Sequence, residues 1–166
     1  MNLRIGKIFA LFFICALLVV GAAYSPPARA ADQAQNFTLK STTGTMVSLS
    51  QFKGKQPVLL EFFATWCPHC QEMAPELAKM RKSIPDSQLA ILAIDVGSRD
   101  SFEKVKRYTQ DNHFPFTVLF DEGSKVSQLY GIVGIPYVTL LDKNGAIKYQ
   151  GYELPSDVMS LLKPGK

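Results

Sequence analysis

LLEFFATWCPHC, residues 59–70, is the most informative stretch of this sequence, because an apolar run leads directly into two cysteines separated by two residues. The run predicts a buried strand followed at once by a helix. Cys67 then falls in the first helical turn, where free backbone N–H groups and the helix dipole stabilise a thiolate. Cys70 lies three residues on, on the same helix face and within disulfide reach. We therefore expect Cys67 to attack and Cys70 to resolve.

The two residues between the cysteines are expected to tune the pair. Pro68 suits the first helical position, where its missing N–H costs nothing and its fixed φ is helical. His69 can bring positive charge and donors close to the Cys67 sulfur. Both favour the thiolate, and a stabilised reduced form makes the disulfide a stronger oxidant.

The motif resembles the W-C-x-x-C of the thioredoxin superfamily, and LEFF followed four residues later by CPHC resembles the bacterial disulfide-forming DsbA proteins. The segment at residues 37–60, F-x-L…G-x-x-V-x-L-S-x-F-K-G-K-x-P-V-L-L, resembles the TlpA/ResA branch of exported thioredoxin-like proteins. These resemblances imply an α/β thioredoxin-like fold, with a central mixed sheet flanked by helices. They also imply an N-terminal β-hairpin and a central strand–helix insert. One departure is Met73, which stands where ResA-type reductases carry a Glu.

Further site residues follow from the resemblance. Pro136, in the G-I-P run of residues 134–136, is expected to be the cis-proline that faces the cysteines, with Ile135 and Trp66 facing the substrate. Glu61 lies in the strand that should be buried, where a carboxyl pKa rises. The resemblance gives it a role in proton transfer to and from the buried cysteine. The alternative for Glu61 is a rim carboxylate with access to solvent.

The first thirty residues read as a secretory signal peptide. Arg4 and Lys7 precede an apolar run at residues 8–23, and residues 28–30 form a small-x-small cleavage site. An uncleaved membrane anchor is the alternative, because the run is close to the length of a spanning helix. We expect residues 31–166 to form one thioredoxin-like domain in the periplasm, or anchored to the inner membrane and facing the periplasm.

Removal of residues 1–30 would take away three positive charges, at Arg4, Lys7 and Arg29, and lower the net charge from +4 to +1. The charge then argues against a nucleic-acid partner. Removal of residues 1–30 also leaves Cys67 and Cys70 as the sole cysteines, which points to redox use in an exported protein. A zinc site is disfavoured, because zinc needs about four ligands and the sequence offers no second C-x-x-C.

Alternating apolar patterns predict the remaining elements. Expected strands are residues 37–39 and 46–49 (a hairpin), 58–63, 89–96 and 116–120, with further strands on either side of an Asn-Gly turn at residues 144–145. Expected helices are the one after the cysteines, kinked by Pro75, and residues 100–112, 125–130 and 155–162. Alternating strands and helices predict parallel pairing through right-handed crossovers.

The sequence thus predicts an exported thiol–disulfide oxidoreductase that needs no cofactor beyond the Cys67–Cys70 disulfide. Protein thiols or disulfides would be its substrates, and a membrane redox partner is expected. The CPHC motif favours a relatively oxidising couple. The TlpA/ResA-like architecture instead favours a reductant for cytochrome c or copper-site assembly. A non-catalytic metallochaperone is the alternative from another class.

Overall fold

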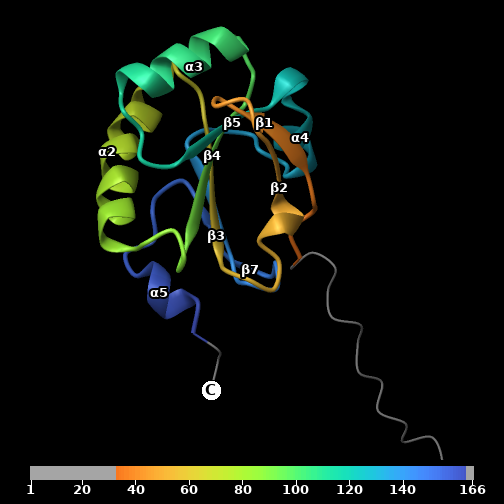
Figure 1. The fold of residues 1–166 in the computed structure, drawn as a ribbon, viewed down its shortest axis with the longest axis vertical. Helices are drawn as coiled ribbons and strands as arrows, with labels where there is room; N and C mark the ends of the chain where they lie inside the picture. The colour runs from red at the N-terminus through yellow and green to blue at the C-terminus, as the bar shows by residue number, and fades with distance from the viewer. Residues whose placement is uncertain (1–32, 164–166) are drawn as a thin grey trace, which may run out of the picture. The chain divides into compact units, whose positions relative to one another are not determined.

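The computed structural model describes residues 33–163, and they form a seven-stranded mixed sheet in the order β2-β1-β5-β4-β3-β6-β7 (Figure 1). The strands are β1 (Thr38–Ser41), β2 (Met46–Ser48), β3 (Val58–Phe63), β4 (Ala90–Asp95), β5 (Thr117–Phe120), β6 (Tyr137–Leu141) and β7 (Ile147–Gly151). The α-helices are α2 (Pro68–Ser83), α3 (Phe102–Asp111), α4 (Lys125–Leu129) and α5 (Val158–Leu161), with short 3₁₀ turns η2 (Leu49–Gln51) and η3 (Glu122–Ser124). The expected fold class is confirmed.

The middle of the sheet is made of β3 and β4, and every residue of both strands is buried. They pair in parallel over their full length, whereas β6 runs antiparallel to β3 on the other side. Continuous apolar strands of this kind need a layer on both faces. Figure 1 shows that layer: α2 and α3 lie on one side of the sheet and α4 lies on the other.

The two predicted hairpins lie at the two edges of the sheet. The predicted hairpin is present as β1 and β2, and β1 also pairs antiparallel with β5. The Asn-Gly hairpin joins β6 to β7, and Gly145 has φ 85°, which suits glycine in such a turn. Because β6 follows directly from Pro136, the sheet carries that proline to the same end as the β3–α2 junction.

One expectation about the helices needs correction. The C-terminal helix is shorter than residues 155–162, because it begins only after Asp157, whose side chain accepts the Ser160 N–H at 2.9 Å. Val158 is buried, whereas Leu161 is exposed and does not pack the helix against the core. Helix α2 continues through Pro75 to Ser83, and the kink expected at Pro75 stays a prediction.

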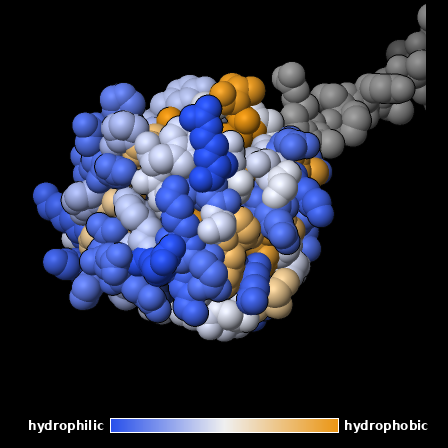
Figure 2. All heavy atoms as spheres, turned by 90° about the horizontal axis from the view of Figure 1, so that it is seen from above, coloured by the Kyte–Doolittle hydropathy of each residue, from blue (hydrophilic) through white to orange (hydrophobic). Residues whose placement is uncertain are grey.

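Figure 2 views the molecule from the end that carries α3. Hydrophilic side chains cover most of this face, and the hydrophobic surface is divided into small patches. Within residues 33–163 no helix is long and apolar enough to cross a membrane. The predicted signal peptide or anchor lies outside the described residues.

Candidate active site at the start of α2

The two cysteines lie at the N-terminus of α2, as predicted. Cys67 is the N-cap residue, Pro68 is the first helical residue, and the Cys70 N–H donates to the Cys67 sulfur at 3.3 Å. The cysteines form a disulfide with a Cα–Cα distance of 5.3 Å, and both are buried. When the disulfide is reduced, this N–H and the helix dipole favour a thiolate on Cys67.

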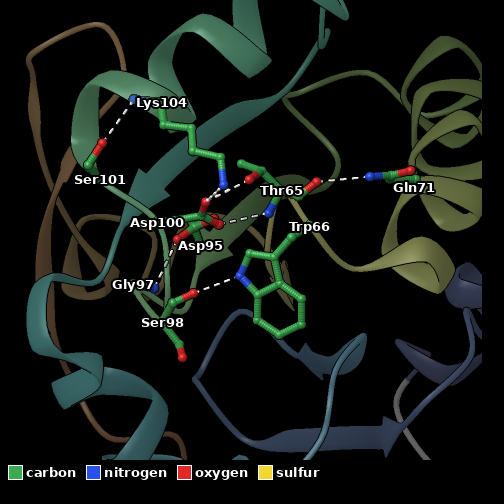
Figure 3. Close-up of polar contacts among 9 residues, drawn as sticks. All are labelled: Thr65, Trp66, Gln71, Asp95, Gly97, Ser98, Asp100, Ser101 and Lys104. Carbon is green, nitrogen blue, oxygen red and sulfur yellow. Dashed lines mark hydrogen bonds and ion pairs between the residues drawn. The ribbon is translucent and has the colours of Figure 1, made fainter.

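The residues that precede Cys67 form a tight turn. The Cys67 N–H donates to the Ala64 carbonyl at 3.2 Å, so the turn has Thr65 and Trp66 as its central residues. The Thr65 carbonyl accepts a hydrogen bond at 2.9 Å from the Gln71 side chain in α2 (Figure 3). The position of the reactive sulfur therefore depends on how this turn is held.

Much of that support comes from the segment between β4 and α3. The Asp100 carboxylate accepts the Thr65 N–H at 2.9 Å and the Thr65 hydroxyl at 2.6 Å. The Trp66 indole N–H donates to the Ser98 carbonyl at 2.7 Å (Figure 3). Sequence reasoning missed Asp100, Ser98 and Gln71. The one available signal was the acid-containing run DVGSRD directly after a buried strand.

On the other side of the cysteines lies the Ile135–Pro136 peptide bond, which is cis. The cis geometry expected for Pro136 is thus confirmed. The Ile135 carbonyl oxygen lies 3.8 Å from the Cys67 sulfur. A disulfide sulfur carries no hydrogen, so this is a packing contact in the oxidised protein, and it becomes a possible S–H acceptor only after reduction. Pro136 is buried and Ile135 is half-buried.

Glu61 is buried in the middle of β3, with 3% of its surface exposed. Burial raises the pKa of its carboxyl to about 8, so at neutral pH the group is mainly protonated. The alternative of a solvated rim carboxylate is therefore wrong. The carboxyl also influences α3, where burial first and the Glu61 charge second raise the pKa of Tyr108.

His69 does not lie where the sequence prediction placed it. Its Nδ1 lies 3.1 Å from a carboxylate oxygen of Glu72, one turn further along α2, and its side chain is 80% exposed. The reason is local, because residues three apart on a helix are surface neighbours. No hydrogen bond from His69 to Cys67 occurs among the described residues.

Trp66 stands at the surface beside the cysteines. It is 39% exposed, and the Arg99 guanidinium lies over its ring at 5.2 Å from the centroid. Val133, two residues before Ile135, is 91% exposed, and Tyr152, which is 54% exposed, lines the same pocket as Ile135 and Pro136. Trp66 and Ile135 are thus both accessible enough to meet a substrate, and this role stays a prediction.

The arrangement suits disulfide exchange better than metal binding. Within residues 33–163, no group of three or more His, Cys, Asp or Glu side chains is placed to hold a metal ion. A buried C-x-x-C disulfide at a helix N-terminus beside a cis-proline has what thiol–disulfide exchange requires: one sulfur that ionises readily and a second that can reclose the bond. The fold and this site define a thioredoxin-like thiol–disulfide oxidoreductase.

Comparisons with known proteins agree. The AhpC/TSA family matches residues 30–150, and the chain belongs to this family. The chain is 35% identical over 118 residues to the thioredoxin-like protein YneN of Bacillus subtilis, a match that covers 70% of this chain and 68% of YneN. It is 29% identical over 142 residues to the thiol–disulfide oxidoreductase ResA of Halalkalibacterium halodurans, covering 82% of this chain and 79% of that protein.

A solved structure gives the same result. The chain resembles a putative thiol:disulfide interchange protein DsbE from Chlorobium tepidum, with a TM-score of 0.68 and 28% identity. That match covers 78% of this chain and 90% of the other. These findings support the TlpA/ResA-like placement within the thioredoxin superfamily.

Proposed function

We propose that this protein is an exported thiol–disulfide oxidoreductase that exchanges disulfides with protein substrates through a mixed disulfide on Cys67, and that its couple is more oxidising than that of thioredoxin. The observation that carries the proposal is the place of Cys67 as the N-cap of α2, with its sulfur accepting the Cys70 N–H. This geometry stabilises the thiolate of the reduced protein and therefore favours reduction of the disulfide.

The reaction with a dithiol substrate proceeds in two exchanges. A substrate thiolate attacks the Cys67 sulfur, the Cys67–Cys70 bond breaks, and Cys70 leaves as a thiolate that takes up a proton. A second substrate thiolate then attacks the substrate sulfur of the mixed disulfide, and Cys67 leaves as a thiolate. Two electrons pass from the substrate to the cysteine pair, and the substrate gains a disulfide. The second step is fast when the leaving thiol has a low pKa, as the N-cap position provides.

Glu61 is the residue we assign to proton transfer for Cys70. Its burial keeps it protonated at neutral pH, with a pKa of about 8. A neutral carboxylic acid in an apolar strand can give up a proton when a buried thiolate forms and take it back when the disulfide closes. The cis Ile135–Pro136 peptide, whose Ile135 carbonyl oxygen lies 3.8 Å from the Cys67 sulfur, limits the directions from which a substrate sulfur can approach.

The potential of the pair tests the proposal. The protein is equilibrated in glutathione buffers of known ratio, and free thiols are quantified, with Cys67→Ser as the control that contains no exchangeable pair. We expect a midpoint more positive than the roughly −270 mV of thioredoxin. A midpoint at or below that value would overturn the oxidising assignment.

A second candidate function is that of a reductant in cytochrome c or copper-site assembly, fed by a membrane electron donor. Its support is the similarity to proteins named ResA and the N-terminal hairpin shared with that branch. The redox state of Cys67 and Cys70 inside a bacterial host separates the two functions. Alkylation of intact cells should find the pair mainly oxidised if the protein is an oxidant, and mainly reduced if it is a reductant.

Export is proposed from the sequence of the first thirty residues. Cleavage after Ala30 would give a protein that begins at Ala31, located in the periplasm. The intact mass of the protein made in a bacterial host measures this directly. A full-length protein found only in the membrane fraction would instead identify an anchor.

A further inference from the structure

The turn before Cys67 is held by an acidic pair that has no part in the reaction described above. Asp100 lies on the β4–α3 segment, its side chain is fully inaccessible to solvent, and it accepts both hydrogen bonds from Thr65. Lys104, one turn into α3, pairs with the same carboxylate (Figure 3). Asp100 thus receives three donors, which is close to what an ionised carboxylate in a protein interior requires.

Asp95, at the end of β4, differs from Asp100 in having too few donors. It is fully buried, its Oδ1 accepts the Gly97 N–H at 2.9 Å, and its Oδ2 has no donor among the described residues. The charge of the Asp100 carboxylate also acts on it. Two ionised carboxylates in this interior would repel each other, whereas a single proton on Asp95 removes that repulsion and turns its unpaired Oδ2 into a donor.

The groups around the two carboxyls favour the proton on Asp95. Burial is the main reason that the pKa of Asp95 rises to about 8, and the Asp100 charge raises it further. For Asp100 burial acts in the same direction, but hydrogen bonds from Lys104 and Thr65 outweigh it and lower the pKa. The pair therefore holds one proton at neutral pH, with Asp95 neutral and Asp100 ionised.

We infer that Asp95 and Asp100 are positioning residues that share one proton and clamp Thr65, and that this clamp fixes the Cys67 sulfur at the N-terminus of α2. The inference rests on the proposed function only in taking Cys67 as the attacking thiol.

The effect reaches Cys67 through the backbone. Thr65 is the second residue of the turn that the Cys67 N–H closes on Ala64, so displacement of Thr65 rotates the peptide that leads into the N-cap. The N-cap sulfur lies 3.3 Å from its donor, and a small displacement weakens that hydrogen bond and its stabilisation of the thiolate. Loss of the clamp should therefore raise the pKa of Cys67.

A purely electrostatic role for Asp100 would have the opposite sign. A negative carboxylate near the sulfur disfavours the thiolate, so its removal alone would lower the pKa of Cys67. Lys104 pairs with Asp100 and the Arg99 guanidinium lies over Trp66, so positive charges also face this region. The direction of the change in Cys67 pKa therefore separates positioning from charge.

The test compares two isosteric substitutions, Asp100→Asn and Asp95→Asn, in the full chain with Cys70→Ser so that only the Cys67 thiol reacts. The rate of iodoacetamide alkylation is followed from pH 4 to pH 9. Asn at position 95 keeps an acceptor for Gly97 and an N–H donor for Asp100. We therefore expect the alkylation rate of Cys67 to change by less than about twofold. Asn at position 100 loses an acceptor for Thr65, so we expect the alkylation profile to move up by about one pH unit, which lowers the rate about tenfold at pH values below the Cys67 pKa.

Equal changes in the two variants, no change in Asp100→Asn, or faster alkylation in Asp100→Asn would each overturn the clamp. Should Asp100→Asn fail to fold, Thr65→Val and Thr65→Ser give the same answer. Valine keeps the size but removes the hydroxyl donor, and we expect it to slow alkylation severalfold, while serine keeps the donor and should leave the rate unchanged. Equal rates for valine and serine would likewise overturn the clamp.

These outcomes are independent of the proposed function. A wild-type potential at or below that of thioredoxin would remove the oxidising assignment and leave the comparison of variants intact. Conversely, if the two aspartate variants did not differ in alkylation rate as expected, the clamp would be overturned and the potential of the wild-type protein would be unaffected.

Discussion

Two consecutive strand–helix units, β3–α2 and β4–α3, lie side by side and differ in the residue that caps the helix. The Cys67 sulfur accepts the Cys70 N–H at 3.3 Å, and the Ser101 hydroxyl accepts the Lys104 N–H at the same distance. The backbone thus supplies the same donor and the same helix dipole to a thiol in one unit and to a hydroxyl in the other. A thiol with a reference pKa of about 8.5 ionises under that influence and becomes reactive, whereas the hydroxyl only completes the helix.

The two units also each bury an acid in the strand, and here the difference lies in the partners. Burial alone raises the pKa of Glu61 to about 8. Asp95 reaches a similar value, but it has a donor in Gly97 and a second carboxyl in Asp100. An isolated acid is free to exchange its proton with a nearby group, whereas a proton shared with Asp100 is part of the structure. The comparison suggests why we assign proton transfer to Glu61 and positioning to Asp95.

The largest effect should come from converting the thiol cap into a hydroxyl cap. Cys67→Ser makes the start of α2 chemically like that of α3, and it should abolish mixed disulfides with substrate proteins. Cys70→Ser leaves the attacking thiol without its resolving partner, so mixed disulfides should accumulate. Non-reducing gels of the two variants after incubation with an unfolded substrate protein that contains a disulfide measure this, because the Cys67 thiolate attacks that disulfide and displaces one substrate thiolate. Trapping by Cys67→Ser instead would reverse the roles of the cysteines.

Local signals in the sequence were sufficient for the β3–α2 unit. A run that is apolar apart from Glu61 predicted β3 at residues 58–63, and the C-x-x-C with Pro68 predicted the helix start. The buried state of Glu61 followed from its place in that run, and the cis bond at Pro136 followed from resemblance to a known motif. Each of these features depends on residues close together in the chain or on a recurring pattern.

The β4–α3 contribution could not be predicted in the same way. Thr65 and Asp100 are 35 residues apart, and Trp66 and Ser98 are 32 apart, so only the folded sheet brings them together. Nothing in a run such as DVGSRD distinguishes a solvated loop acid from a buried one. His69 is a different case, because a competing partner one turn away, Glu72, was present in the sequence and was not weighed.

A second prediction concerns the isolated acid. The folded pKa of Glu61 lies above its unfolded value of about 4.5, so its contribution to stability is complete below that pH and is lost as the pH rises towards about 8. Between pH 5 and pH 7.5 this one group should lower the free energy of unfolding by about 3 kcal/mol. Glu61→Gln removes this titration. Between pH 5 and pH 7.5 the free energy of unfolding of Glu61→Gln, measured in urea, should therefore fall by about 3 kcal/mol less than that of the wild type.

The matched control for that experiment is Glu72→Gln, which removes an exposed acid and should leave the pH dependence as in the wild type. Parallel pH dependences for Glu61→Gln and the wild type would mean that Glu61 is ionised in the folded protein. That result would contradict its assignment as a proton carrier at neutral pH.

A third prediction concerns the hydroxyl cap. Ser101→Ala should lower the free energy of unfolding by about 1 kcal/mol, because the Lys104 N–H loses its side-chain acceptor. Since Asp100 keeps its own hydrogen bonds, the glutathione midpoint of the cysteine pair should stay within error of the wild type. A shift in that midpoint would show that the two units are coupled through the cap and not only through the clamp.

The smallest effect should come from His69, and its size decides between the sequence prediction and the structure. With an 80% exposed side chain paired to Glu72, His69 acts on the Cys67 sulfur only through a solvent-screened charge. We expect His69→Ala in the Cys70→Ser background to slow alkylation of Cys67 at pH 6 by less than about threefold, and the effect to shrink further in 0.5 M salt, where the screening length falls to a few ångströms. Glu72→Gln is the matched variant, because it removes the pairing carboxylate and frees the imidazole, so alkylation should become slightly faster. A tenfold loss in His69→Ala that persists in high salt would mean that the imidazole turns from Glu72 to the sulfur once the disulfide is reduced, as a direct donor to the thiolate.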